Sequence, residues 1–376
     1  MGILKHLGRT KKERPPRIGE TVSVDVTQDG NRVSVEGDGI NISYSVEGVT
    51  LPPGIDASFV AWGLLPAAME EGFNLQINRP IDPEVAANAE RLSEIWEMWL
   101  PGQYRSINVA GQGEWSRIPR KRLARAHLFS GGIDSAFAIL RARDPKQEGV
   151  AVTVCGIDKT NERNFDRLVS KTDSLLGQLN CRRIVVRTNA QRQPSGITHG
   201  LTLASCLFFL SDLFEVGILA ADRSPAGDAV HFPWGSNHVT NAYFTGSDFI
   251  VRTVGAIGRA EKIAALVEAG IDLQSLSICR NGDTIPENCG RCAKCIRTKA
   301  EFLSTIGYIP NIFLDASING DMLHQLVNKD SERYHFFDFY TYAKKHGTAE
   351  KIPDLERVAE EWRALVTLPI RRRVAK

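Results

Sequence analysis

A glycine-rich turn between an apolar run and a helical segment is the feature that most constrains the fold of this chain. Residues 123–129 (LARAHLF) are predicted to form a short buried strand, and residues 136–143 (AFAILRAR) to begin a helix. The turn between them, residues 130–135, is SGGIDS. Glycines let the backbone approach a bound anion, and the free N–H groups of a helix start carry positive partial charge. The sequence therefore predicts a phosphate-binding turn.

The nucleotide prediction depends on the whole hexapeptide. An isolated Gly-Gly pair before a helix would predict only a tight turn capped by Asp or Ser. The six residues in a strand–turn–helix setting favour nucleotide binding instead. Neither GxxxxGK[ST] nor GxGxxG at a strand–helix junction occurs in the chain. The common alternative nucleotide signatures therefore have no support.

Strands and helices alternate after residue 123, which predicts an α/β fold with a doubly wound parallel sheet. The expected strands are residues 123–129, 151–157, 183–186 and 218–220, and the expected helices begin at 136 and cover 164–179 and 201–214. In such sheets ligands bind at the carboxyl ends of the strands. The SGGIDS turn falls at such an end.

The first part of the chain has a different pattern. Valine and isoleucine alternate with polar residues from 22 to 46, which predicts a three-stranded antiparallel meander. Residues 59–71 are expected to be helical and 73–77 a strand, and Asp82-Pro83 is a helix start with Asp as N-cap. Together they predict a smaller α+β N-terminal module. The expected division is a basic disordered leader at 1–17, the module at 18–115, a nucleotide-binding α/β domain at 120–310 that includes a cysteine-rich segment at 279–295, and a helical C-terminal extension at 311–376.

Four of the seven cysteines lie close together in a polar, turn-rich segment at 279–295. Their spacing is C-x9-C-x2-C-x2-C, and the ligands are Cys279, Cys289, Cys292 and Cys295. Cys-x2-Cys turns direct two thiolates at one ion, so a structural Zn²⁺ site is the favoured interpretation. An iron–sulfur cluster, which also uses four cysteines, remains an alternative. The other three cysteines lie in or beside apolar segments and are expected to be inert buried thiols.

Charge and composition exclude several classes of protein. The formal net charge is only +2, so a nucleic-acid partner is possible but is not favoured. No apolar run is long enough to span a bilayer, and the start lacks the apolar core of a secretory signal. The number of cysteines is odd and four of them are clustered, which argues against a disulfide framework. A cytoplasmic protein without a membrane partner is expected, and a homodimer is left open.

The hexapeptide fits the SGGxDS signature of the PP-loop ATP pyrophosphatases, and the chain resembles that family. With the cysteine motif added, it resembles the 7-cyano-7-deazaguanine synthase branch. That branch has a C-x8-C-x2-C-x2-C zinc motif followed by an arginine; here the first gap is one residue longer, and Ile296-Arg297 follow the last cysteine. Residues 258–263 (GRAEKI) resemble the Lys-Ala-Glu helix start of the branch, with Arg259 in the lysine position. The resemblance covers roughly residues 123–310.

The resemblance implies an adenine-nucleotide alpha-hydrolase-like fold and a turn that holds the β- and γ-phosphates of ATP, so that the α–β bond breaks. It implies a catalytic role for Asp134, Arg259 and Lys262, with the two cations facing the phosphates and Asp134 helping to order Mg²⁺. For Asp158, a plain strand-end turn residue is an equal alternative. The implied nucleotide-binding residues are Ser130, Gly131, Gly132, Asp134, Ser135 and Asp158.

The expected function is that of an ATP-dependent ligase. It would adenylylate a carboxylate or amide-like oxygen, release pyrophosphate, and let a nitrogen nucleophile displace AMP. The substrate would be a small molecule, or a carboxylate on a modified base or peptide, recognised by residues 222–248; an ordinary surface loop is the equal alternative there. Alternative functions are a tRNA or nucleobase modifier of thiolase or lysidine type, and a non-catalytic nucleotide-binding subunit.

Overall fold

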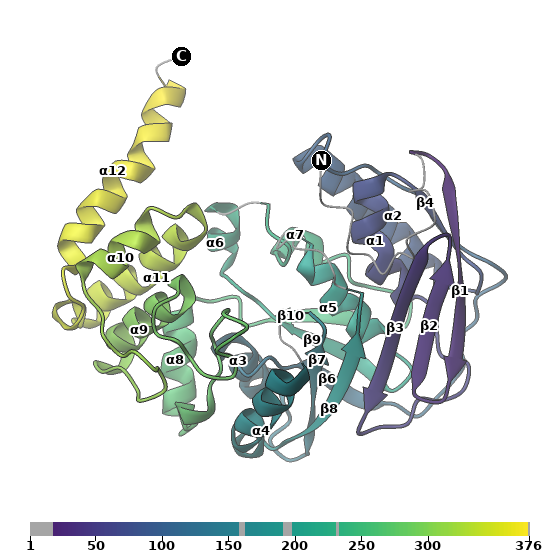
Figure 1. Cartoon of the computed structure of the whole chain (residues 1–376), viewed down its shortest axis with the longest axis horizontal. Helices are drawn as coiled ribbons and strands as arrows, with labels where there is room; N and C mark the ends of the chain where they lie inside the picture. The colour runs from purple at the N-terminus through teal and green to yellow at the C-terminus, as the bar shows by residue number, and fades with distance from the viewer. Residues whose placement is uncertain (1–17, 158–161, 191–197, 231–232, 375–376) are drawn as a thin grey trace.

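The structure is a computed structural model that describes residues 18–157, 162–190, 198–230 and 233–374. Within these residues ten strands form one sheet, in the order β10-β9-β6-β7-β8-β3-β2-β1-β4-β5 (Figure 1). The predicted leader at 1–17 lies outside the described residues. The strands are β1 Thr21–Asp29, β2 Arg32–Gly37, β3 Ile40–Glu47, β4 Asn74–Ile77, β5 Val109–Gly111, β6 Leu123–Leu128, β7 Gly149–Cys155, β8 Cys181–Thr188, β9 Phe214–Ala220 and β10 Ile250–Val254.

Five neighbouring strands, from β10 to β8, pair in parallel, as the alternating sequence pattern predicts. Apolar side chains of β7 enter different cores on the two faces of this sheet. Val150 and Val152 join the core that includes α5, whereas Ala151 joins the core under α3 and α8. Burial on both faces is typical of parallel strands covered by crossover helices. The chain thus has an α/β fold with a large, mostly parallel central sheet.

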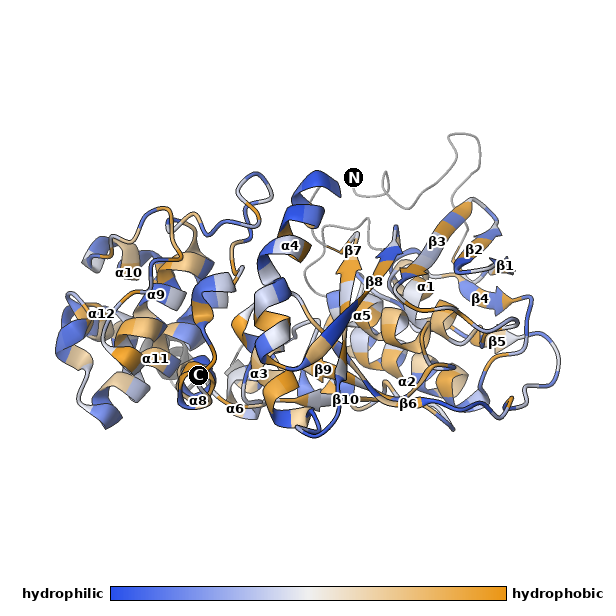
Figure 2. Ribbon diagram, turned by 90° about the horizontal axis from the view of Figure 1, so that it is seen from below, coloured by the Kyte–Doolittle hydropathy of each residue, from blue (hydrophilic) through white to orange (hydrophobic). Residues whose placement is uncertain are grey.

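The helices cover both faces of this sheet. Figure 2 shows the hydrophobic residues gathered on α5, α2 and the strands beside them. The helices of the first two thirds of the chain are α1 Phe59–Glu71, α2 Pro83–Trp99, α3 Ile133–Ala142, α4 Glu162–Gln178, α5 His199–Phe208, α6 Pro225–Val230, α7 His238–Asn241 and α8 Arg259–Glu268. No helix of the described residues is long and apolar enough to cross a membrane.

The strands of the N-terminal segment continue the same sheet. The predicted meander is confirmed as β1, β2 and β3, which pair antiparallel. β3 then pairs antiparallel with β8, with Tyr44 opposite Thr188 and Glu47 opposite Val185. The predicted cap of α2 is also confirmed, since the Asp82 side chain accepts a hydrogen bond from the Glu84 N–H at 2.9 Å. The predicted boundaries between modules stay predictions.

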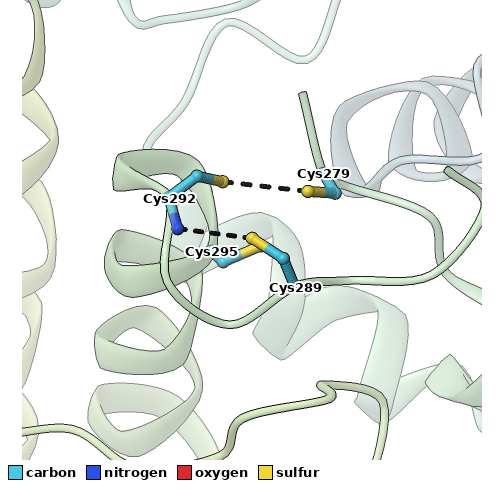
Figure 3. Close-up of side chains that lie close together, drawn as sticks. All are labelled: Cys279, Cys289, Cys292 and Cys295. Carbon is cyan, nitrogen blue, oxygen red and sulfur yellow. Dashed lines mark hydrogen bonds between the residues drawn. The ribbon is translucent and has the colours of Figure 1, made fainter. Parts of the chain in front are cut away.

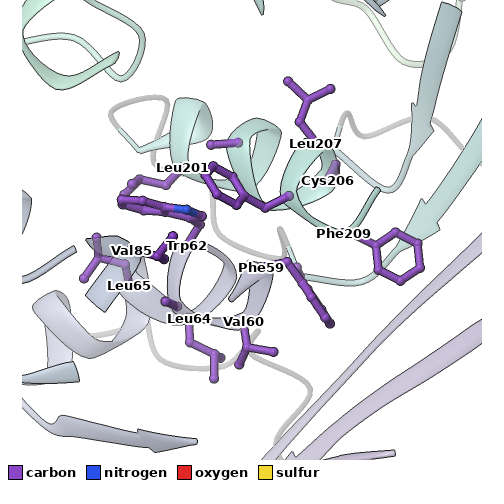
Figure 4. Close-up of a cluster of buried hydrophobic side chains, with 14 of the residues drawn as sticks. Phe59, Val60, Trp62, Leu64, Leu65, Val85, Leu201, Cys206, Leu207 and Phe209 are labelled. Atoms are coloured by element: carbon purple, nitrogen blue, oxygen red, sulfur yellow. The ribbon is translucent and has the colours of Figure 1, made fainter. Parts of the chain in front are cut away.

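Aromatic side chains join α1 to α5 across the N-terminal and central segments (Figure 4). Trp62 is fully buried, with ring centroids 5.7 Å from Phe208 and 5.4 Å from Phe244. At Gly63 an added Cβ would lie 2.4 Å from the Tyr44 hydroxyl oxygen of β3 and 2.9 Å from the Ser205 hydroxyl oxygen of α5, so only glycine allows α1 to approach both elements this closely. Truncating a buried tryptophan to alanine costs about 3–5 kcal/mol. The N-terminal segment is therefore packed into the core of the central sheet.

The C-terminal extension is helical, as predicted. It packs beside α8 and has a small core of its own, to which Phe336, Phe339 and Val358 belong. The helices of the extension are α10 Gly320–Val327, α11 Asp330–His346 and α12 Leu355–Val374, and α9 Ala293–Ile306 precedes it. α12 projects away from the rest of the chain in Figure 1. The extension lies at the opposite end of the molecule from the meander.

One boundary prediction was wrong. The apolar run at 201–214 was expected to be a single helix, but α5 ends at Phe208 and β9 begins at Phe214. Phe214 pairs with Leu123 of β6. This pairing in the sheet makes the end of the apolar run a strand, although its residues also suit a helix. No strand is predicted from the sequence between residues 102 and 122, but this segment contains a short strand, β5, which pairs with β4.

Candidate functional site

The SGGIDS turn lies at the carboxyl end of β6, at the point where the strand order of the parallel sheet reverses. From β6 the chain adds β7 and β8 on one side, then returns to add β9 and β10 on the other. Ligands of open α/β sheets bind at such a reversal point, where neighbouring loops separate. The structure thus positions the predicted phosphate-binding turn where an α/β sheet is open to a ligand.

Two glycines shape the turn. Gly131 has φ of 77°, the left-handed region that favours glycine, and an added Cβ would lie 2.6 Å from Cγ2 of Thr172. Gly132 is the N-cap of α3 in an extended conformation. The Ser130 N–H donates to the Ser135 hydroxyl at 3.2 Å, and that hydroxyl donates to the Gly132 carbonyl at 3.0 Å. These contacts hold the turn open above the start of α3.

The structure brings together the three residues predicted to be catalytic. Lys262 Nζ donates to Asp134 Oδ1 at 2.8 Å and to the Ala221 carbonyl at 2.7 Å. Arg259 Nη2 donates to Asp134 Oδ2 at 2.5 Å. Both cations stand on the first turns of α8 and are buried, while Asp134 is on the first turn of α3. Two helix starts and two cations therefore converge on the turn, which is favourable for binding a polyphosphate.

The charges of this group reinforce one another. Burial opposes ionisation of Asp134, but Arg259 and Lys262 outweigh it and lower the pKa of the carboxyl. Burial likewise opposes ionisation of Asp222, and Arg223 and Arg259 hold its pKa well below the usual range. Both carboxylates are therefore ionised and engaged by cations. An incoming phosphate would compete with Asp134 for the same two cations.

Two acidic residues near the turn were missed from the sequence. Asp222 follows β9 directly and lies 3.6 Å from Nη2 of Arg259, so its strand-end position was an available signal. Asp338 belongs to α11 and accepts from the backbone N–H groups of Arg259 at 2.7 Å and Ala260 at 3.5 Å. It thereby caps α8 from the C-terminal extension. No local pattern marks Asp338 as such a cap. The predicted residue Asp158 lies outside the described residues.

The predicted substrate segment at 222–248 is not one long loop, because it contains α6 and α7. Arg223, only 3% exposed, has its guanidinium 4.8 Å from the ring centroid of Trp234. Nη1 of Arg223 forms an ion pair with Asp222 at 3.6 Å, but neither Nη1 nor Nε makes a hydrogen bond within the described part of the chain. A buried guanidinium with unsatisfied N–H groups is costly unless an anion or acceptor joins it. Arg223 is therefore suited to contact a ligand beside the turn.

The four predicted metal ligands form a compact cluster at the start of α9 (Figure 3). Their four sulfur atoms lie within 4.8 Å of one another, with Cys279 to Cys292 at 3.9 Å and Cys289 to Cys295 at 3.8 Å. A Zn–S bond of about 2.3 Å in a tetrahedron separates the sulfurs by about 3.8 Å. The N–H groups of Arg291 and Cys292 point at Cys289 Sγ, each at 3.4 Å. The cluster could hold a metal ion such as zinc.

The remaining cysteines have the environment expected of inert thiols. Burial raises the pKa of Cys181 to about 11 and that of Cys206 to about 12. Burial also raises the pKa of Cys155, although Arg187 opposes the shift. A thiol must ionise to attack or to carry sulfur, so none of the three is prepared for such chemistry at neutral pH.

A cavity of about 200 Å³ lies at the other edge of the parallel strands. Its wall includes residues that precede β6, β9 and β10, and its charged side chains pair with one another. Arg122 binds Asp248 at 3.1 Å, and the Asp56 carboxylate accepts from Trp115 Nε1 at 2.6 Å. The glycine-rich turn is at the opposite ends of these strands. This cavity is therefore separate from the candidate site.

Comparison of the chain with protein-family models, with curated proteins and with solved structures finds no match. Function is therefore inferred from the residues and from their geometry.

Proposed function

We propose that the chain is an ATP-dependent ligase of PP-loop type with an adenine-nucleotide alpha-hydrolase-like fold. It adenylylates a carboxylate or amide-like oxygen and releases pyrophosphate, after which a nitrogen nucleophile displaces AMP. The observation that carries the proposal is the convergence of Arg259 and Lys262 on Asp134, beside the backbone of Gly131 and Gly132. This combination suits the β- and γ-phosphates of ATP.

The arrangement supports cleavage between the α- and β-phosphates. In the proposed complex the turn and the start of α3 hold the β- and γ-phosphates together, so the α-phosphate is left facing the acceptor. Arg259 and Lys262 then stabilise the negative charge that develops on pyrophosphate as it leaves. Asp134 keeps both cations in place before ATP arrives.

The expected Mg²⁺ role of Asp134 has little support. Its Oδ1 accepts from Lys262, and its Oδ2 accepts from Arg259. Asp222 is also paired, with Arg223 and Arg259, each at 3.6 Å. These carboxylates are poor candidates for a dedicated Mg²⁺ site, and the metal is expected to come bound to the ATP phosphates.

We propose that the cysteine cluster holds one structural Zn²⁺. The near-tetrahedral sulfur separations favour a single ion over a multinuclear iron–sulfur cluster, in which the cysteines bind different iron atoms. The site would fix the start of α9 against the segment that follows α8. Four thiolate ligands also agree with a reducing, cytoplasmic setting.

Product analysis tests this function. The protein is incubated with Mg²⁺, ATP and a panel of carboxylates that includes 7-carboxy-7-deazaguanine and peptide C-termini, with ammonium chloride as nitrogen source. The proposal predicts equal amounts of pyrophosphate and AMP that depend on the acceptor. Release of ADP would refute cleavage of the α–β bond. Tight ATP binding without turnover would favour the non-catalytic alternative, and a strict requirement for tRNA would favour the nucleic-acid modifier.

A further inference from the structure

Asp228 and His238 form an oriented acid–histidine pair near the candidate site. Nδ1 of His238 hydrogen bonds to Oδ2 of Asp228, and the backbone N–H of His238 donates to the same oxygen at 3.1 Å. The carboxylate therefore fixes the proton on Nδ1 and leaves the lone pair on Nε2. An imidazole held in this way can accept a proton, and the resulting cation is stabilised by the carboxylate behind it.

Three buried acceptor atoms around this pair have no partner within the described ranges. They are Nε2 of His238, Oδ1 of Asp228 and Oδ1 of Asn241. Asn241 lies three residues after His238, on the same side of α7. Its Nδ2 donates to Ser236 at 3.1 Å and to Thr253 at 3.0 Å, which leaves the amide oxygen as the free end. All three atoms require a donor, so they suit a ligand that carries several N–H groups.

The pair is located at the edge of the sheet where the phosphate-binding turn lies. Asp228 is connected to the end of β9 through a short segment, and its N–H donates to the Ser224 carbonyl at 3.0 Å. Ala221, at the same strand end, accepts from Lys262. Thr253, which contacts Asn241, belongs to β10, the neighbour of β9. The acceptor atoms thus adjoin strand ends that also hold the catalytic cations.

We infer that Asp228, His238 and Asn241 bind the nitrogen nucleophile, ammonia or a primary amine, and that His238 is its general base. This inference rests on the proposed function. The nucleophile arrives as an ammonium ion, and Nε2 of His238 takes one proton from it. The nitrogen lone pair then forms a bond to the acyl carbon, and the bond between that carbon and the AMP oxygen breaks. AMP leaves with the electron pair of the broken bond, and the extra proton of the new amide is released.

The binding part is tested with methylammonium chloride as the probe. The ring signals of ¹⁵N-labelled histidine are followed in the full-length protein, and the signal of His238 is assigned by its loss in His238→Gln. We expect a saturable shift of this signal that Asn241→Leu abolishes, with the other histidines unaffected. Absence of a saturable shift in the wild-type protein would overturn the inference.

The catalytic part is tested by separating the two half-reactions. ATP–pyrophosphate exchange with 7-carboxy-7-deazaguanine reports adenylylation, and ammonium-dependent AMP release reports transfer. His238→Gln is expected to keep exchange within about twofold and to lose transfer to ammonia by at least 100-fold. Hydroxylamine is unprotonated at neutral pH and needs no base, so transfer to hydroxylamine should remain within about fivefold of the wild type.

These outcomes distinguish failure of the His238 inference from failure of the ligase proposal. Equal losses with ammonia and hydroxylamine would mean that His238 is structural, and unchanged transfer to ammonia would mean that it is not the base. Either result overturns the inference and leaves the ligase proposal standing. Absence of exchange in the wild-type protein with every acceptor of the panel would refute the ligase proposal, and the inference would fall with it.

Discussion

Lys262 and Asp134 link two helix starts that are 128 residues apart in the chain. The 2.8 Å bond between Nζ of Lys262 and Oδ1 of Asp134 holds α8 and α3 in a fixed arrangement around the glycine-rich turn. Lys262 is fully buried, so its charge is stabilised by Asp134 and by the Ala221 carbonyl. In the proposed complex a phosphate competes with Asp134 for this buried charge, which the two contacts already hold beside the turn.

Replacing Lys262 by methionine is expected to lower ATP turnover by at least about 100-fold, because the leaving pyrophosphate loses a preorganised cation. The fold should persist, since methionine fills most of the same volume. Lys121→Met, at an exposed position, is the matched control. Turnover is measured as pyrophosphate release at saturating ATP. Equal rates for the two variants would exclude Lys262 from the chemistry.

Replacing Gly131 by alanine is expected to destabilise the turn by about 1–3 kcal/mol and to abolish ATP binding. Alanine disfavours φ of 77°, and its Cβ would lie 2.6 Å from Cγ2 of Thr172. Gly132→Ala is the control for the stability measurement, since its φ is −94° and the nearest contact of the new Cβ is 3.5 Å, to the Ser130 hydroxyl. Urea unfolding and ATP titration measure both effects. Similar unfolding midpoints for the two variants would contradict the geometry of the turn.

Glu301 predicts a dependence of stability on pH. The side chain is fully buried on α9, and burial raises its pKa from 4.5 to about 8, although Arg259 and Arg297 oppose the shift. Between these values the folded state keeps a proton that the unfolded state has lost, so stability falls as the pH rises. Glu301→Gln should remove this contribution. As the pH rises from about 5 to about 8, the free energy of unfolding of the wild type should fall relative to that of Glu301→Gln by at least about 1.4 kcal/mol, the equivalent of one pKa unit.

Chemical unfolding at a series of pH values checks this prediction. Glu350→Gln, at an exposed position, serves as the control and should follow the wild-type curve. If Glu301→Gln had the same pH dependence as the wild type, Glu301 would be ionised in the folded protein.

The cysteine cluster predicts one zinc ion per chain. Cys289→Ser is expected to lose the ion and to lower the melting temperature by roughly 5 °C or more, because the start of α9 is no longer tied to the preceding segment. Cys155→Ser, outside the cluster, should keep both the metal and the melting temperature. Elemental analysis of purified protein provides the measurement. Iron in place of zinc would instead support the cluster alternative.

Much of this architecture can be predicted from local sequence. The β-α-β alternation, the meander, the Asp82 cap and the cysteine spacing each depend on neighbouring residues, and the structure agrees with each of them. The grouping of Asp134 with Arg259 and Lys262 followed from the resemblance, and not from any local pattern.

Other features depend on contacts between distant segments. The end of α5 at Phe208 is set by pairing of Phe214 with β6, and the apolar run itself contains no stop signal. Continuation of the sheet from β8 into β3 joins strands about 140 residues apart, and no pattern in either strand marks the partner. Asp338 caps α8 from the C-terminal extension, a relationship that is visible only after folding.

The most direct test of adenylylation follows an oxygen atom. An acceptor carboxylate labelled with ¹⁸O is incubated with the protein, Mg²⁺, ATP and ammonium chloride, and the nucleotide product is examined by mass spectrometry. If the carboxylate attacks the α-phosphate, the AMP that is released carries one ¹⁸O atom from the acceptor. Unlabelled AMP, or ADP as the product, would contradict the account.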